Sequence, residues 1–397
     1  MVVSKVLTGN YAVAHAVKLS RAQVIAAYPI TPQTTIVEKL AQFVESGELN
    51  AKYIRVESEH SAMAACIGAS ATGARVFTAT ASQGLLYMSE MVWWAGMGRY
   101  PMVMAIVTRA IGPPWSIWTE HNDVLAHRDC GWIIFFAEDN QEAFDLTIQA
   151  FRISEDERVL QPAMVTLDAF ILSHTATPVI MPEQSEVDNY LPPPGARKLP
   201  YVLDPSNPVT HGNLTYPDWL MEFRYQIAMA MERAKKVIVE AGKEYGKMTG
   251  RYYDSLVEAY RCSDADAAII TMGSSAGDAK DAVDILRDEG YRIGAIKMRT
   301  IRPFPTEELR SICSGFKAVA IVDRNYSYGY SGILHGEIKS ALQGLKVTAQ
   351  NFIAGLGGRD VTVKDFISVG KKLYEIIEKG LGEQPPIWIN LKREVIP

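Results

Sequence analysis

The sequence predicts an α/β fold in which a mostly parallel sheet carries helices on both faces. In the first 170 residues or so, short apolar runs typical of buried strands alternate with longer segments of helical periodicity. A second series of the same kind begins near Asp264, after a stretch rich in proline. At 397 residues the chain is long enough for two or three domains, each with its own core.

A first domain is expected over residues 1–177. Its strands are predicted at 24–28, 52–56, 75–81, 101–108, 129–137 and 161–167, and its helices at 10–19, 35–46, 62–74, 85–97 and 140–154. In an open sheet of this type, ligands bind beyond the carboxyl ends of the strands. Polar residues that directly follow a predicted strand are therefore the first candidates for a site.

The segment Arg55–Met63 carries two carboxylates and a histidine into the helix 62–74, whose side chains are mostly small. Small side chains let a helix pack closely against another surface. A carboxylate at the start of that helix, such as Glu59, faces the positive end of the helix and the packed interface, where it can share a proton with a bound base. Taken alone, an acidic residue in a first turn is more often structural than catalytic.

Thr31 and Arg109 are candidates because each follows a predicted strand. Thr31 stands between two prolines that stiffen the turn, and its hydroxyl can bond a carboxylate or carbonyl group. From local sequence alone, a helix cap by Thr31 or Thr34 is the favoured interpretation. Arg109 has the side chain that binds a carboxylate through two parallel hydrogen bonds, although an arginine at a strand end is often only solvated or salt-bridged.

Composition excludes several function classes. A net charge of −5 and a pI of about 5.9 give no basic footprint for nucleic acid. No run of about 18 apolar residues predicts a membrane span, and the N-terminus lacks the apolar core of a signal peptide. The four cysteines include no CxxC pair, so neither zinc nor an iron–sulfur cluster is expected in this chain. Their sparseness predicts a reducing, cytoplasmic location.

Residues 178–262 are expected to form a connector between domains. It would consist of an extended, proline-rich part from Pro178 to Tyr216 and a long helix, Met221–Tyr245. A second α/β domain is expected over residues 263–397, beginning with a strand at 267–272, a glycine-containing turn at 273–277, a helix at 279–289 and a strand at 291–298. The turn is not GxGxxG, so it indicates a nucleotide site only weakly.

Several motifs occur together in the order and spacing seen in the alpha subunits of 2-oxoacid:ferredoxin oxidoreductases, above all the pyruvate enzymes. They are Tyr28–Thr35, Val56–His60, Thr78–Leu85, Arg109–Ile111, His121–Asp123, Arg128–Asp129, Thr300–Pro305, Asp323–Asn325 and Gly355–Asp360. The chain resembles this family over nearly its whole length. The resemblance implies a pyrimidine-binding domain of the thiamine diphosphate-enzyme type, followed by a domain with the transketolase C-terminal fold.

The resemblance also implies roles for individual residues. Glu59 matches the glutamate that bonds the aminopyrimidine ring of thiamine diphosphate and so activates it. Arg109 matches the arginine that holds the carboxylate of the 2-oxoacid, and Thr31 becomes a substrate contact, which leaves Thr34 as the helix cap. The implied reaction is oxidative decarboxylation of a 2-oxoacid with coenzyme A to acyl-CoA and CO2, with electrons passed to iron–sulfur clusters.

Much of the equipment for this reaction is missing from the sequence. The chain has no GDG motif with a downstream asparagine pair for Mg2+ and diphosphate, and no cysteine-rich region. The resemblance therefore implies a hetero-oligomer. A beta subunit would hold the diphosphate and Mg2+, and gamma and ferredoxin-like delta subunits would carry [4Fe-4S] clusters. External ferredoxin or an NAD-reducing subunit would accept the electrons.

The segment Gly112–Trp118 departs from the pyruvate enzymes. Its double proline and Trp115 would suit a pocket for an aromatic 2-oxoacid, such as phenylglyoxylate or indolepyruvate, while packing of Trp115 against a partner is an equally supported interpretation. Pyruvate is favoured by its abundance in the family. A non-catalytic scaffold subunit is a further alternative, against which the intact Thr31, Glu59 and Arg109 argue.

The segment from His121 to His127 contains two histidines and Asp123, which are common metal ligands. Their spacing is not that of a known helix or loop chelate, so no metal site is expected there. The resemblance implies that this segment only borders the active site.

Overall fold

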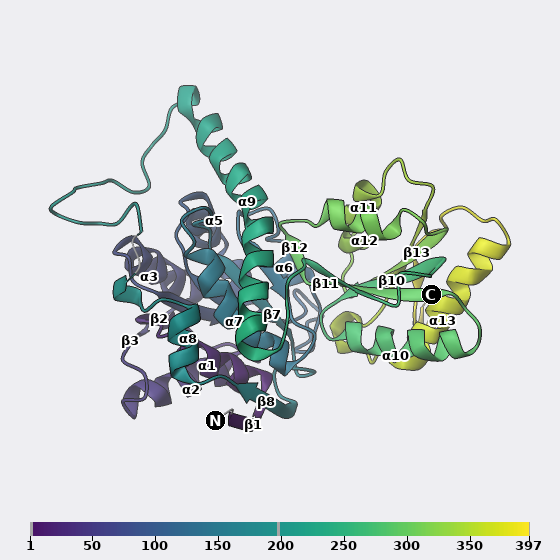
Figure 1. The fold of residues 1–397 in the computed structure, drawn as a ribbon, viewed down its shortest axis with the longest axis horizontal. Coiled ribbons are helices and arrows are strands. Elements are labelled where there is room, and N and C mark those ends of the chain that lie inside the picture. Colours follow the sequence, from purple (N-terminus) through teal and green to yellow (C-terminus); the bar gives the residue numbers. More distant parts are fainter. Residues whose placement is uncertain (1–2, 197–198, 397) are drawn as a thin grey trace.

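The computed structural model describes residues 3–196 and 199–396 of the chain. Two helix-covered sheets lie next to each other along the long axis of the molecule (Figure 1). Apart from the green strand β12, the first is built from the purple and teal half of the chain, and the second is built from the green and yellow half. A small third sheet pairs β1 (Val3–Thr8) with β8 (Ala176–Met181) in antiparallel fashion. The prediction of an α/β fold with mostly parallel strands is confirmed.

The first sheet has seven strands in the order β12-β6-β7-β5-β4-β2-β3, all parallel to their neighbours except β12. The strands are β2 (Val24–Ala27), β3 (Lys52–Arg55), β4 (Val76–Thr80), β5 (Val103–Thr108), β6 (Ile133–Phe136), β7 (Ala163–Asp168) and β12 (Thr300–Arg302). Side chains alternate across the strands, so that Phe77 of β4 enters one core and Val76 the other. Both faces must be covered, which explains the continuous apolar runs in the sequence.

Helices cover each face of this sheet. One face carries α1 (Gly9–Leu19), α2 (Thr34–Glu45) and α7 (Asn140–Ser154), and the other carries α3 (Glu59–Ala71), α4 (Ser82–Tyr87), α5 (Ser89–Met97) and α6 (Asn122–Leu125). The core on the second face continues into the second unit of the chain. The two units therefore share apolar packing, which limits their independent movement.

The second sheet has the order β15-β14-β13-β10-β11-β9, with only β9 antiparallel. Its strands are β9 (Val257–Tyr260), β10 (Ala267–Met272), β11 (Ile293–Met298), β13 (Ala318–Asp323), β14 (Thr348–Ile353) and β15 (Ile387–Trp388). Helices α10 (Ser275–Asp288) and α13 (Val363–Glu378) pack on one face, and α11 (Thr306–Cys313) and α12 (Ile333–Ala341) on the other.

The connector differs from the expectation in its secondary structure. The part predicted to be extended contains most of β8 and the helix α8 (Gln184–Tyr190), because β1 supplies a strand partner that no local pattern reveals. The long helix α9 runs from Pro217 to Thr249, beginning with a proline where no N–H is needed and ending at the left-handed Gly250. Its first turns project from the body of the molecule (Figure 1).

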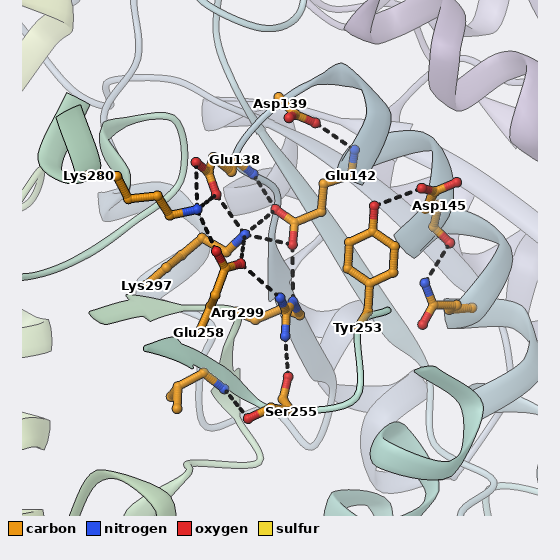
Figure 2. Close-up of polar contacts among 12 residues, drawn as sticks. Glu138, Asp139, Glu142, Asp145, Tyr253, Ser255, Glu258, Lys280, Lys297 and Arg299 are labelled. Carbon is orange, nitrogen blue, oxygen red and sulfur yellow. Dashed lines mark hydrogen bonds and ion pairs between the residues drawn. The ribbon is translucent and has the colours of Figure 1, made fainter. Parts of the chain in front are cut away.

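Buried ion pairs join the two units (Figure 2). Lys297 of β11 donates hydrogen bonds of 2.9 and 3.0 Å to the carboxylate of Glu142 on α7, and Arg299 donates one of 3.1 Å. Burial by itself raises the pKa of Glu142, but the two cations outweigh it, and the pKa is lowered. Asp168, at the end of β7, accepts hydrogen bonds of 3.0 Å from Arg324 and from the backbone of Ser274.

In the part of the chain that the structure describes, no helix is both long and apolar enough to cross a lipid bilayer.

Candidate active site

Thr31 lies in the loop that joins β2 to α2. Gln33 Nε2 donates hydrogen bonds to the carbonyl oxygens of Tyr28 (2.8 Å) and Ala79 (3.2 Å), and Asn10 Nδ2 donates one to Pro32 O (2.7 Å). These buried amides hold the loop against the end of β4. Thr31 itself is exposed, and none of the described residues hydrogen bonds to its hydroxyl group, which is thus available to a ligand.

The prediction that Thr34 caps the following helix is wrong. The helix begins at Thr34, and the residue at the cap position is Gln33, whose side chain makes no capping hydrogen bond. A capping side chain must stand before the first helical residue to reach the free N–H groups. Thr34 is already inside the first turn.

Glu59 is the first residue of α3, directly after Ser58, whose hydroxyl caps the helix by accepting from the N–H of Ser61 at 3.2 Å. The side chain of Glu59 is buried, and no described residue hydrogen bonds to its carboxyl group. It packs against Gly84, where an added β-carbon would lie 2.6 Å from Glu59 Oε1 and 2.5 Å from Thr80 Oγ1. The carboxyl group therefore has room only because residue 84 has no side chain.

Arg109 lies at the carboxyl end of β5. Its Nη1 donates a hydrogen bond of 2.7 Å to Thr31 O, and its Nη2 donates one of 3.0 Å to Gln83 Oε1. Among the described residues, its buried Nε has no partner. Burial lowers the pKa of the guanidinium group, and the charge of Asp123 opposes that shift. A guanidinium has five N–H donors, so about three remain for a ligand.

The turn Ser82-Gln83-Gly84 brings the predicted site residues together. Gly84 contacts Glu59, and Gln83 contacts Arg109, which in turn contacts the backbone of Thr31. Reasoning from the sequence gave no role to Gln83 or Gly84. The signal that was present is their position directly after a buried strand, in a segment that ends with glycine.

Trp115 lies over the same arginine. Its ring centroid is 5.2 Å from the guanidinium carbon of Arg109, and 62% of the tryptophan is exposed. The surrounding loop is anchored on the second unit, because Ser116 Oγ donates a 3.2 Å hydrogen bond to Gly357 O and Trp118 packs against Gly358. The role of Trp115 in substrate binding remains a prediction.

The segment from His121 to His127 makes separate contacts rather than a cluster. His121 Nε2 bonds Asp168 Oδ1 at 2.7 Å, and His127 Nδ1 lies 2.9 Å from Asp123 O. The carboxylate of Asp123 accepts backbone N–H groups, including that of Arg109. Among the described residues, no three histidine, cysteine or carboxylate side chains are grouped as metal ligands.

The donor set fits the pyrimidine ring of thiamine diphosphate. The carboxyl group of Glu59 is buried at the positive end of a helix and has no hydrogen-bond partner among the described residues, which suits a heterocyclic ring nitrogen that must share a proton. Arg109, at the end of the neighbouring strand β5, has N–H donors that make no hydrogen bond to the described residues. Fold and site together indicate the class, which is that of thiamine diphosphate-binding α/β proteins.

Comparison with known proteins identifies the family. The profile described as "Pyruvate flavodoxin/ferredoxin oxidoreductase, thiamine diP-bdg" matches residues 15–243, and "Pyruvate:ferredoxin oxidoreductase core domain II" matches residues 265–366. The chain belongs to the 2-oxoacid:ferredoxin oxidoreductase family and is an alpha subunit of such an enzyme.

Two relatives match the chain over 98% or more of its length. Ketoisovalerate oxidoreductase subunit VorA of Pyrococcus abyssi is 50% identical over 98% of this chain and 98% of its own length. Pyruvate synthase subunit PorA of the same organism is 47% identical over 100% of both chains.

Two solved structures share the fold. The 2-oxoglutarate:ferredoxin oxidoreductase from Magnetococcus marinus matches with a TM-score of 0.70 and 20% identity, covering 95% of this chain and 65% of that one. A split-gene transketolase matches with a TM-score of 0.55 and 13% identity, covering 94% of this chain and 99% of that one. The expected relation to the transketolase fold is thereby confirmed.

Proposed function

We propose that this subunit provides the pyrimidine-binding carboxyl group and the substrate-binding arginine of a 2-oxoacid site, with Glu59, Arg109 and Thr31 in these roles. One observation carries the proposal: a single turn, residues 82–84, contacts both the Glu59 carboxyl group and the Arg109 guanidinium. Side chains that are 50 residues apart are thus gathered at one edge of the sheet.

Thiamine diphosphate, when bound, supplies the carbon nucleophile that attacks the keto group of the substrate. The Glu59 carboxyl group holds a proton at the ring nitrogen. Because the carboxyl group is buried, water is excluded from that contact. Arg109 uses one donor to hold the Thr31 loop and another to hold Gln83, and its remaining N–H groups bind the substrate carboxylate. The Thr31 hydroxyl, to which no described residue hydrogen bonds, is available to bond the substrate.

The rest of the site comes from partner chains. A beta subunit holds Mg2+ and the diphosphate, because the motif for them is missing from this sequence. Gamma and ferredoxin-like delta subunits carry [4Fe-4S] clusters that pass electrons to ferredoxin or an NAD-reducing subunit, and coenzyme A takes the acyl group.

The proposed substrate is a 2-oxoacid with a small aliphatic side chain, of the pyruvate type. The VorA and PorA relatives, named for ketoisovalerate and pyruvate, support this proposal at nearly equal identity. A second candidate is an aromatic 2-oxoacid, such as phenylglyoxylate or indolepyruvate. The observation that favours it is Trp115, which stands exposed over Arg109 and offers a ring face beside the carboxylate site.

The test is reduction of a viologen dye by the co-purified complex with thiamine diphosphate, Mg2+ and coenzyme A. Pyruvate, 2-oxoisovalerate, phenylglyoxylate and indolepyruvate are compared. Reduction with an aliphatic 2-oxoacid as the best substrate is the expected result, whereas preference for an aromatic one makes Trp115 part of the pocket. If none of the four reduces the dye in a complex saturated with cofactor, the proposed function is wrong.

A further inference from the structure

We propose that Asp123 is a positioning residue, which fixes Arg109 and the Glu59 carboxyl group relative to each other by bridging the backbones of two strand ends. This inference rests on the proposed function of Glu59 and Arg109. The hydrogen bonds that Asp123 accepts all come from backbone N–H groups, so its effect passes through the segments that it holds.

The carboxylate of Asp123 accepts three backbone N–H groups while its side chain is fully buried. Its Oδ2 accepts those of Ser82 and Arg109, each at 3.0 Å, and its Oδ1 accepts that of Val124 at 2.7 Å. Ser82 lies just past the end of β4 and Arg109 just past the end of β5, and these strands are neighbours in the sheet. One oxygen atom therefore sets the separation of two strand ends.

The bridged ends carry the site. From Ser82 the chain passes directly to Gln83, which accepts a hydrogen bond from the Arg109 side chain, and to Gly84, which packs against Glu59. Ser82 has φ of 47°, a left-handed conformation that a residue with a side chain adopts only when its surroundings hold it. A second link spans the same ends, because Ser82 Oγ donates a 2.6 Å hydrogen bond to Ala110 O.

Capping of a helix does not account for this arrangement. Asp123 belongs to α6, which has four residues, and only the N–H of Val124 comes from that helix. The other two donors lie 41 and 14 residues away in sequence. Burial raises the pKa of Asp123 to about 7, and the backbone N–H groups of Arg109, Ser82 and Val124 oppose that shift. An apolar residue at this position would leave all three N–H groups buried without an acceptor.

The chain offers a matched control in Asp323. This carboxylate is also fully buried and accepts backbone N–H groups, from Leu334 at 2.8 Å and His335 at 3.2 Å, within the second unit. Burial raises its pKa to about 7 as well. The Asp323 carboxylate also accepts hydrogen bonds from Asn325 Nδ2 at 2.9 Å and Asn351 Nδ2 at 2.8 Å. The change Asp323→Asn therefore removes the charge of a second buried carboxylate whose hydrogen bonds do not reach the strand ends of the site.

The experiment compares Asp123→Asn, Asp323→Asn and the unchanged protein, each in the complete hetero-oligomer. KM and kcat for the preferred 2-oxoacid, the Kd of thiamine diphosphate from fluorescence titration, and Tm are measured. We expect Asp123→Asn to raise KM and the Kd by about tenfold or more, because a shift of Arg109 or the Glu59 carboxyl group by about 1 Å weakens binding and catalysis. Asp323→Asn should lower Tm to a similar extent and leave KM and Kd within about twofold.

Equal losses of Tm in the two variants, with KM and Kd unchanged in both, would overturn the inference. If Asp123→Asn prevents assembly, Ser82→Ala removes the Ser82 Oγ contacts with Ala110 O and Gln83 Oε1 and keeps the backbone N–H that Asp123 accepts. That variant must raise KM about threefold or more for the inference to stand. Arg109→Gln distinguishes a failure of the proposed function from a failure of the positioning role. An unchanged KM in that variant would refute the proposed function itself, whereas a raised KM there with normal Asp123→Asn kinetics would refute only the positioning role.

Discussion

Gly84 is a sensitive test of the site because its backbone forms the wall against which Glu59 rests. In Gly84→Ala, the new β-carbon would lie 2.6 Å from Glu59 Oε1 and 2.5 Å from Thr80 Oγ1. Ordinary van der Waals contact begins near 3.4 Å, so Glu59 Oε1 must retreat by about 0.8 Å and Thr80 Oγ1 by about 0.9 Å. Glu59 will move more readily, since its carboxyl group is the end of a flexible side chain and Thr80 is branched at its β-carbon.

The expected cost falls on function more than on stability. A displacement of nearly 1 Å in a catalytic group lowers activity by about 100-fold. Overpacking lowers the free energy of unfolding by about 1–3 kcal/mol. Because Gly84 lies within α4, the higher helix propensity of alanine raises it by about 1 kcal/mol. We therefore expect kcat/KM to fall by about 100-fold while the net destabilisation stays below about 2 kcal/mol.

The assay measures viologen reduction and thermal unfolding of the complex side by side. Gly277→Ala is the matched control, because Gly277 is also the third residue of a helix, α10, and its β-carbon would meet only Glu138 Oε1, at 3.6 Å. This variant should keep full activity. The reasoning is refuted if Gly84→Ala has normal kcat/KM, or if its loss of activity merely follows a loss of Tm that Gly277→Ala shares.

The buried ion pairs give two further predictions. Lys297→Met leaves Glu142 with only part of its compensating charge and should lower the free energy of unfolding by about 3–5 kcal/mol. Denaturant titration measures this loss. The double variant Lys297→Met with Glu142→Gln should recover part of it. Burial raises the pKa of Glu258, but Lys297 and Lys280 outweigh it and lower that pKa to about 2. The contribution of Glu258 to stability is therefore present above about pH 4.3 and is lost as the pH falls toward 2. The difference in unfolding free energy between the unchanged protein and Glu258→Gln should shrink over that interval. A difference that stays constant would contradict the lowered pKa of Glu258.

The strands and the site edge were predictable because their causes are local. Buried parallel strands leave continuous apolar runs, and residues that follow such runs, including Thr31 and Arg109, must gather at one edge of the sheet. The small side chains after Glu59 predicted a helix over 62–74, and α3 begins and ends three residues earlier, so that Glu59 is its first residue. These predictions needed no knowledge of distant contacts.

The features of the fold and the site that were not predicted depend on pairings between distant segments. The partner of β8 is β1, about 170 residues earlier, and β12 returns from the second half of the chain to pair with β6. Asp123 attracted attention as a metal ligand because it stands near two histidines, while its partners are backbone N–H groups, which leave no trace in the amino-acid types. Gly84 is informative only once Glu59 is seen against it.

The most direct test of the central claim is Glu59→Gln in the complete complex. The account predicts that thiamine diphosphate still binds, since glutamine fills the same space, and that viologen reduction falls by about 100-fold or more with every 2-oxoacid, since the amide cannot transfer a proton to the ring nitrogen. Reduction at the unchanged rate, in a complex shown to contain stoichiometric thiamine diphosphate, would contradict the assignment of Glu59 as the activating carboxyl group.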